Sequence, residues 1–304
     1  MADNKLVGHL AAAGAYAIFG FNIVFNKDIA NTGMVSPMVM FLLRAVGACA
    51  LFWILSAFMP REKVPARDLW LMVLASFLGL FVPQVSFLFA IELATPIDTA
   101  VLGALTPIYT MCFAFLFLHE PITFKKAGGV AMSLSGVMLL IFNSVHADGA
   151  VARTQPLGVL LLAINGLSFA GYLGAFRPLI SRYSVVTLMK WMFLFSLLMA
   201  LPFSLGGLMQ TPFADLAPSV AWEIAFVVVF ATFVAYFLIP VGQKYLRPTL
   251  VSMYSYLQPI VAAVISITLG MDRFTWQKVL AAVLIFGGVA LVSRSRAASD
   301  LPKS

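Results

Sequence analysis

Side chains that can exchange hydrogen bonds with a solute lie inside a strongly apolar stretch of this chain, around Pro107. Thr99, Thr106, Tyr109 and Thr110 are spaced by intervals close to whole turns of a helix, which places them near one helix face. Hydroxyl groups donate and accept hydrogen bonds without carrying charge, so this face suits a neutral or zwitterionic solute. The alternative is that the proline only kinks the helix and that the hydroxyls bond to neighbouring helices.

A second copy of this arrangement follows further along the chain. The interval that leads from Pro107 to Pro259 also leads from Glu120 to Asp272, without a gap. Positions that correspond across such a repeat should lie on related walls of one cavity. The polar pairs found in this way are Thr106 with Gln258, Gln84 with Tyr236 and, in a weaker register, Asn22 with Tyr172. The second pair lies nearer helix ends, where interfacial packing or gating is an equal alternative.

Each of the two prolines also releases a backbone acceptor. Pro107 has no N–H group and leaves the carbonyl of Gly103 without its helical partner, and Pro259 does the same to Ser255. A released carbonyl can accept a hydrogen bond from the ammonium or hydroxyl group of a solute. The predicted substrate-binding residues are Asn22, Arg44, Gln84, Thr106, Tyr109, Tyr172, Tyr236, Ser255 and Gln258, and Asn26 and Asn165 are expected along the same paths.

Charged residues inside the apolar stretches are few. Arg44 lies deep in the second stretch, and Lys190 lies near the start of the seventh. Ionisable residues within a membrane are candidates for function, so Arg44 is a candidate to bind a substrate carboxylate. A structural pairing of Arg44 with helix-end carbonyls is an equal alternative. Lys190 is expected to extend its amino group to the membrane surface instead.

Acidic residues are missing from the middle of every apolar stretch. A proton-coupled drug antiporter needs a titratable acid in its cavity, so the sequence favours facilitated diffusion or exchange. The chain also has no nucleophile beside a base, no His/Cys cluster with metal-ligand spacing and no Gly-rich phosphate loop. The sequence therefore predicts no enzymatic activity, no cofactor and no metal site.

The elements that must position these side chains are membrane helices. Of the 304 residues, 62% are hydrophobic and 10% are charged, and the mean hydropathy is +1.00. In soluble domains about a quarter of the residues are charged. Apolar runs of roughly 20 residues cross the hydrocarbon layer as helices. The sequence predicts an all-α membrane protein with ten transmembrane helices, near residues 6–26, 35–58, 68–91, 97–118, 124–143, 156–176, 185–206, 220–241, 249–269 and 276–293.

The distribution of Lys and Arg predicts the orientation of these helices. One side of the membrane receives most of the basic residues, and the other receives only Lys27, Arg153, Arg273 and Lys278. Basic residues accumulate in cytoplasmic loops, so both termini are expected in the cytoplasm, and the net charge of +7 is a topology signal. A unit of five helices that occurs twice must take opposite orientations. Residues 1–146 and 155–296 are therefore predicted to form two inverted five-helix repeats.

Short motifs recur in a definite order along the chain. Phe19-Gly20 is followed by Asn22, Phe25 and Lys27, and later come Pro37, Arg44, Pro96, Thr106-Pro107 and Glu120-Pro121. This order resembles the drug/metabolite transporter superfamily in its EamA-type branch of ten helices, with the YddG-like aromatic amino acid exporters as the nearest named comparison. The resemblance implies a central cavity among helices 1, 3, 4, 6, 8 and 9, with helices 5 and 10 packed outside.

Inverted repeats are common in secondary transporters, whose substrate site lies near the midplane at interrupted helices. The resemblance implies a transporter of the inner membrane that moves a small polar metabolite by alternating access, with amino acid export as the leading hypothesis. The alternative is a nucleotide-sugar or phosphorylated-metabolite exchanger, for which Lys244 and Arg247 form only a weak candidate pair. The expected partners are the lipid bilayer and a small solute, without nucleic acid, and a monomer is favoured over a dimer.

Overall fold

The computed structural model describes residues 2–94, 102–103, 105–145, 155–268 and 276–295, and within these ranges every regular element is a helix. Thr99, Pro96 and Asp272, together with the basic residues Arg153 and Arg273, lie outside the described residues. The described part of the chain therefore agrees with the predicted all-α fold.

The first half of the chain forms the following elements: α1 (Ala2–Asn31), α2 (Pro37–Ala57), α3 (Ala66–Ser76), the π-helix η1 (Phe77–Phe81), α4 (Val82–Leu93), α6 (Thr106–Leu118) and α7 (Phe124–Val145). The second half forms α8 (Pro156–Ala175), α9 (Arg177–Arg182), α10 (Val185–Gln210), the 3₁₀ turn η2 (Phe213–Asp215), α11 (Pro218–Val228), the π-helix η3 (Val229–Val234), α12 (Ala235–Tyr245), α13 (Pro248–Met253), the 3₁₀ turn η4 (Tyr254–Tyr256), α14 (Leu257–Thr268) and α15 (Trp276–Ser293).

Several helical stretches are long and apolar enough to cross a membrane. Among the described residues there are six of them: Lys5–Asn31, Pro37–Ala57, Ala66–Leu93, Pro156–Ala175, Val185–Gln210 and Pro218–Tyr245. Two shorter apolar helices are Thr106–Leu118 and Val279–Val292. A helix needs about 20 apolar residues to span a bilayer, so the chain is a multi-pass membrane protein. The expected number of ten transmembrane helices stays a prediction.

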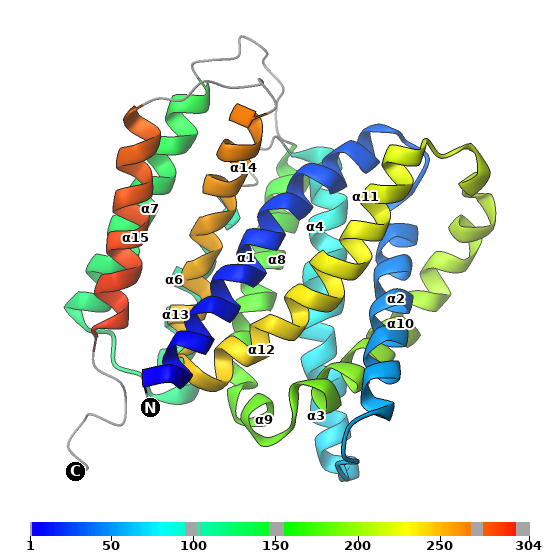
Figure 1. Cartoon of the computed structure of the whole chain (residues 1–304), viewed down its shortest axis with the longest axis horizontal. Helices are drawn as coiled ribbons and strands as arrows, with labels where there is room; N and C mark the ends of the chain where they lie inside the picture. The colour runs from blue at the N-terminus through cyan, green and yellow to red at the C-terminus, as the bar shows by residue number, and fades with distance from the viewer. Residues whose placement is uncertain (1, 95–101, 104, 146–154, 269–275, 296–304) are drawn as a thin grey trace.

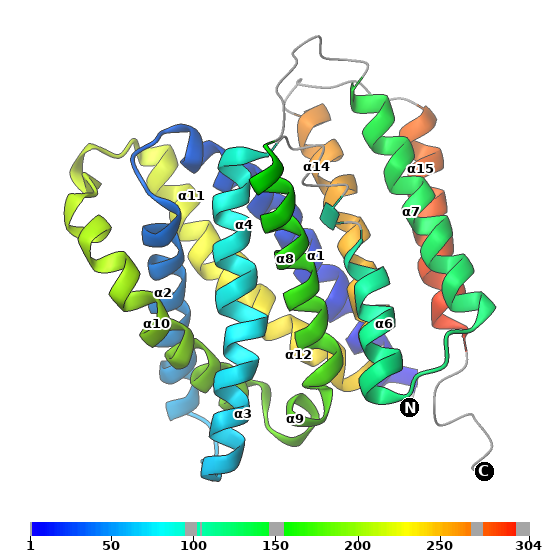
Figure 2. The same cartoon turned by 180° about the vertical axis from the view of Figure 1, so that it is seen from behind.

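The helices form a middle group flanked by two pairs (Figures 1 and 2). The pair α7 and α15 stands at one edge of the molecule, and α2 packs along α10 at the other edge. Between these edges α1 packs against α12 and α14, and α8 packs against α4 and α6. The short helix α9 and the N-terminus lie at the same end of the molecule, which we call the α9 end.

Small residues allow α7 and α15 to approach closely. A Cβ atom placed on Gly288 would lie 2.1 Å from Ser133 Oγ and 2.4 Å from the carbonyl oxygen of Gly129. The hydroxyl of Ser133 donates a hydrogen bond to the carbonyl of Ile285, at 3.0 Å. Small residues at helix contacts are the usual means of close packing in membranes. Gly129, Ser133 and Gly288 therefore bring α7 and α15 into close contact.

Prolines and the two π-helices, η1 and η3, interrupt the helices of the middle group at corresponding places. Pro107 lies in the first turn of α6, and Pro259 lies in the first turn of α14, directly after the 3₁₀ turn η4. The interval between these prolines also separates the start of η1 at Phe77 from the start of η3 at Val229. π-turns are rare in helices and frequent near functional sites. Each π-helix here ends shortly before a predicted site residue, Gln84 or Tyr236.

Candidate functional site

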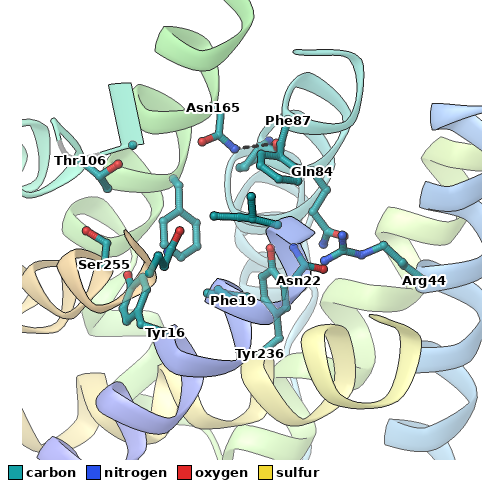
Figure 3. Close-up of a pocket in the computed structure, with 15 residues that line it drawn as sticks. Tyr16, Phe19, Asn22, Arg44, Gln84, Phe87, Thr106, Asn165, Tyr236 and Ser255 are labelled. Carbon is teal, nitrogen blue, oxygen red and sulfur yellow. Dashed lines mark hydrogen bonds between the residues drawn. The ribbon is translucent and has the colours of Figure 1, made fainter. Parts of the chain in front are cut away.

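A cavity of about 110 Å³ lies within the middle group of helices (Figure 3). A buried water needs roughly 10–15 Å³ measured in this way, so the cavity has room for several waters or a small solute. Its walls come from α1, α2, α4, α6, α8, α12, η4 and α14, together with Gly103. The lining residues are Tyr16, Phe19, Asn22, Ile23, Arg44, Pro83, Gln84, Phe87, Gly103, Thr106, Asn165, Phe169, Tyr236, Ser255 and Gln258.

Most of the residues predicted from the sequence lie in this lining. They are Asn22, Arg44, Gln84, Thr106, Tyr236, Ser255 and Gln258. Tyr109 and Tyr172 lie outside it. Tyr109 packs against Gly166, where an added Cβ atom would be 3.1 Å from its ring, and Tyr172 fills the space beside Gly79 of η1. The structure thus brings the two proline breaks and both members of the Gln84–Tyr236 pair to one cavity.

The two asparagines expected along the same paths take different places. Asn165 lines the cavity and donates from its Nδ2 to the carbonyl of Pro83, at 2.7 Å (Figure 3). Asn26 lies one turn beyond Asn22 on α1 and donates from its Nδ2 to the Oδ1 of Asn22, at 2.8 Å. It lines a separate, smaller cavity together with Glu92. The side chains of Asn22 and Asn26 therefore connect the walls of the two cavities.

Sequence reasoning missed the aromatic part of the lining. Tyr16 and Phe19 are three positions apart on α1, and Phe169 follows Asn165 by one turn on α8. The rings of Tyr16 and Phe19 meet edge to face with centroids 5.7 Å apart, and the rings of Phe19 and Tyr236 do so at 5.5 Å. Aromatic spacing could have revealed this wall only with knowledge of which helix face looks inward, because Phe and Tyr occur on every face of these helices.

Polar atoms without partners lie at the cavity. The hydroxyls of Tyr16 and Ser255 are buried and form no hydrogen bond with any residue that the structure describes, and the buried amide of Gln84 lies beside the hydroxyl of Tyr236. Leaving a buried polar atom unbonded costs about 1–3 kcal/mol. These atoms belong to three different helical segments and face a common space (Figure 3). They are available to bond a solute that carries donors and acceptors.

Arg44 enters the same cavity from α2, with its guanidinium directed toward Asn22 and Gln84 (Figure 3). The residue is 2% exposed. Its Nε donates to the hydroxyl of Thr232, at 2.9 Å, and its Nη2 donates to the carbonyl of Ala231, at 3.5 Å. Thr232 and Ala231 belong to the π-helix η3. Arg44 therefore contacts backbone within a helix, whereas the sequence interpretation considered helix-end carbonyls.

The other basic residues considered from the sequence lie elsewhere. Lys190 donates to the hydroxyl of Ser56, at 2.8 Å, and its Nζ lies 5.2 Å from the ring centre of Trp53. Arg247 donates from Nη2 to the carbonyl of Ser295, at 3.0 Å. Among the described residues, Arg44 is the single basic residue of the cavity lining, and the lining has no Asp or Glu. The chemistry of the cavity is therefore one positive charge among uncharged polar and aromatic groups.

A buried ion network connects both halves of the chain at the α9 end. Lys126 Nζ lies 2.7 Å from Glu120 Oε2, and the two side chains are 1% and 3% exposed. Arg177 Nη1 lies 3.4 Å from Glu120 Oε1, and its Nη2 donates to the carbonyl of Leu246. Burial lowers the pKa of the Arg177 guanidinium, while the nearby Glu120 carboxylate acts in the opposite direction. The network joins α7, α9 and the end of α12.

A second cluster at this end ties α3 to the segment that follows α9. Arg182 Nη1 lies 2.6 Å from Asp68 Oδ2, and the hydroxyl of Tyr183 donates to the same carboxylate oxygen. Burial raises the pKa of the Tyr183 hydroxyl, and its bond to Asp68 raises it further. Glu62 accepts hydrogen bonds from the N–H and hydroxyl of Ser184, the residue that caps α10. These contacts hold the helices together on the α9 side of the cavity.

The chain is similar to a family of transporters and to several named proteins. The sequence model described as the EamA-like transporter family matches residues 6–142 and again residues 156–294. The Bacillus subtilis protein named "Uncharacterized transporter YetK" is 22% identical over 295 residues, which are 95% of this chain and 87% of that protein. The "Probable terminal-alkyne amino-acid exporter" of Streptantibioticus cattleyicolor is 28% identical over 159 residues, 51% of each chain. One solved crystal structure is similar with a TM-score of 0.73 and 20% identity, covering 96% of this chain and 97% of the other, which supports the fold.

Proposed function

The chain belongs to the EamA-like transporter family, and from this premise we propose that it exports amino acids or similar small polar metabolites across the inner membrane by alternating access. Membership makes it a transporter of the drug/metabolite type and points away from an enzyme. The observation that carries the finer proposal is the cavity whose buried polar groups, on Gln84, Tyr16 and Ser255, come from separate helical segments. Such a cavity can hold a solute and release it when the segments separate.

Many transporters that work by alternating access consist of two halves of opposite orientation, and we propose that residues 1–146 and 155–296 are such five-helix repeats. The contacts support this arrangement, because α1 packs against α12 and α14 as α8 packs against α4 and α6. Figure 1 shows α1 leading away from the α9 end, whereas α8 leads toward it. In each half a π-helix comes shortly before a residue of the cavity lining, Gln84 or Tyr236. A proline then lies in the first turn of a later helix, α6 or α14.

The orientation in the membrane follows from the basic residues. Lys126, Arg177, Arg182 and Arg247 lie at the α9 end, as do the residues that link α2 to α3. Basic residues favour the cytoplasmic side, so we propose that this end and both termini face the cytoplasm. The network of Glu120, Lys126 and Arg177 would then close the cytoplasmic side of the cavity in the state that the structure represents.

The substrate class is proposed from the cavity and from one relative. An amino acid is small, polar and zwitterionic, and the lining of amides, hydroxyls, aromatic rings and one arginine offers partners for both of its charged groups. The probable amino-acid exporter of Streptantibioticus cattleyicolor provides a named precedent among similar proteins. A phosphorylated-metabolite exchanger is less well supported, because the described lining of the cavity does not include Lys190, Lys244 or Arg247.

Reconstitution in liposomes tests the function. The purified protein would be screened with labelled amino acids, nucleosides and phosphorylated metabolites, with and without a proton gradient. We expect transport of amino acids that persists without the gradient, because no carboxylate lines the cavity among the described residues. Transport that stops when the gradient collapses would contradict uncoupled transport. Preference for phosphorylated solutes would replace the proposed substrate class.

The proline breaks provide a prediction for mutagenesis. Thr106→Val and Gln258→Leu each remove polar atoms from the lining, one near each proline. A hydrogen bond to a solute contributes about 1–1.5 kcal/mol, so each variant should weaken apparent affinity in the liposome assay by roughly tenfold. Ser252→Ala is the control, because this buried hydroxyl on α13 bonds to the carbonyl of Thr249 within its own turn. Full activity in both cavity variants would remove the proposed site.

A further inference from the structure

Among the described residues, no acidic side chain of the cavity neutralises the positive charge of Arg44. The guanidinium has five N–H donors, and the hydrogen bonds to Thr232 and Ala231 occupy its Nε and one donor of Nη2. Within the described residues, its neighbours in the lining are amides, hydroxyls and apolar groups. The ion pairs found among the described residues do not include Arg44. Donors of Arg44 therefore remain for a group inside the cavity.

A buried charge of this kind is costly unless an opposite charge accompanies it. Removing a cation from water costs several kcal/mol even after the protein relaxes, and bonds to neutral groups offset only part of that cost. A carboxylate that entered the cavity would accept two parallel N–H bonds from the guanidinium fork, which is the strongest arrangement for this pair of groups. Arginines at membrane depth are functional candidates for this reason.

We propose that Arg44 binds a carboxylate group of the transported molecule, so that a free carboxylate is the required feature of the substrates. The proposal rests on the transport function proposed above and specifies its substrate class: small monocarboxylates, with amino acids among them. Gln84 lies beside Arg44 and offers an amide N–H to the same group. Tyr16, Phe19 and Phe169 contact the apolar remainder of the molecule.

The number of charges distinguishes a carboxylate from a phosphate. A phosphate ester carries a charge of about −1.5 to −2 near neutral pH, whereas a carboxylate carries a single negative charge. Arg44 supplies one positive charge, and the described lining contains no second basic residue. Arg44 with a carboxylate is neutral, whereas Arg44 with a phosphate ester would leave negative charge buried among aromatic rings.

The competing interpretation is that Arg44 only braces the π-helix η3 through Thr232 and Ala231. Bracing would shape the cavity in the same way for every solute. Carboxylate binding affects only those solutes that have the group. The two interpretations therefore differ in the ratio of affinities between solutes, and this ratio does not depend on how much active protein a variant yields.

Three compounds with the same side chain measure this ratio. L-Phenylalanine has both charged groups, L-phenylalaninamide has only the ammonium group, and L-3-phenyllactate has only the carboxylate. Their binding to the purified wild-type protein in detergent would be measured by isothermal titration calorimetry. We expect the two carboxylates to bind at least tenfold more tightly than the amide. In Arg44→Gln this preference should fall to about one, and in Arg44→Lys part of it should remain.

Thr232→Val is the matched variant, since it removes the bracing hydrogen bond and keeps the charge. It should change the affinity for all three compounds by a similar factor and keep the preference for carboxylates. A preference that survives in Arg44→Gln, with the thermal unfolding midpoint unchanged, would overturn the proposal. So would equal binding of all three compounds, or of none, to the wild-type protein. If the liposome screen still finds a transported solute in that case, the transport function stands; if it finds none, the proposed function fails as well.

Discussion

Replacing Glu120 by glutamine is expected to lower the free energy of unfolding by about 3–5 kcal/mol, because the change leaves a buried lysine without its counter-ion. Lys126 and Glu120 are 1% and 3% exposed, and their charged atoms lie 2.7 Å apart. Arg177 would lose the same carboxylate. The measurement is chemical or thermal unfolding of the purified protein in detergent, followed by circular dichroism.

Two further variants test whether the buried ion pair is the cause of this loss of stability. Glu62→Gln at the same end of the molecule changes an exposed carboxylate that bonds to Ser184, and it should alter stability by less than about 1 kcal/mol. Adding Lys126→Met to Glu120→Gln removes the stranded charge and should restore a large part of the lost stability. If Glu120→Gln were no more harmful than Glu62→Gln, burial of the ion pair would not be the source of its stability.

Replacing Gly288 by alanine is expected to destabilise the protein by about 1–3 kcal/mol, since the added methyl group would meet backbone. Its Cβ atom would lie 2.4 Å from the carbonyl oxygen of Gly129, and no side-chain rotation can relieve this contact. The helices α7 and α15 would have to separate, which would also stretch the hydrogen bond from Ser133 to Ile285. Thermal unfolding in detergent detects the loss.

Gly128→Ala provides a control on the same helix pair. A Cβ atom there would lie 3.8 Å from Leu291 Cδ2, an ordinary contact distance. Alanine favours a helix over glycine by up to about 1 kcal/mol, so this variant should be neutral or more stable than the wild type. Gly288→Ala should thus lower the stability, whereas Gly128→Ala should not. Equal effects would show that the close approach at Gly288 does not limit the packing.

The apolar runs of the sequence predicted most helix positions well. The stretch expected near 35–58 is α2 at Pro37–Ala57, and the stretch expected near 156–176 is α8 at Pro156–Ala175. The first helix extends further than expected, from Ala2 to Asn31, and thus includes Lys27. The amino group of Lys27 donates to the carbonyl of Ile91, at 3.0 Å. Hydropathy alone could not reveal this contact, because it depends on a distant helix end.

The wide turns η1 and η3 left no signal in the sequence. Both consist mainly of Phe, Leu, Val and other apolar residues that suit an ordinary α-helix equally well. Neighbouring helices contact both segments: Tyr172 of α8 fills the space beside Gly79, and Arg44 of α2 donates to the hydroxyl of Thr232. Contacts between helices decide such turns, and a single sequence does not display those contacts.

The lining of the candidate cavity was predicted in part, for a physical reason. Polar residues in an apolar helix must face protein or water, so Asn22, Gln84 and Thr106 could be recognised from residue type. Aromatic residues occur equally in contact with lipid, between helices or in a cavity. Their residue type therefore does not predict which way the side chain faces. The weaker register of the repeat paired Asn22 with Tyr172. In the structure Tyr172 lies outside the lining, whereas Phe169, which corresponds to Phe19 in that register, lies in it.

The matching positions of η1 and η3 say something about ancestry. One family sequence model fits both halves of the chain, so the halves descend from a single ancestral unit. A π-turn arises when a helix accommodates an extra residue in one turn. One such event before the gene duplicated explains both turns, whereas two later events would have had to fall at the same position. A single origin of the π-turn before duplication is therefore the more economical account, and Gln84 and Tyr236 now differ beside a shape that both halves share.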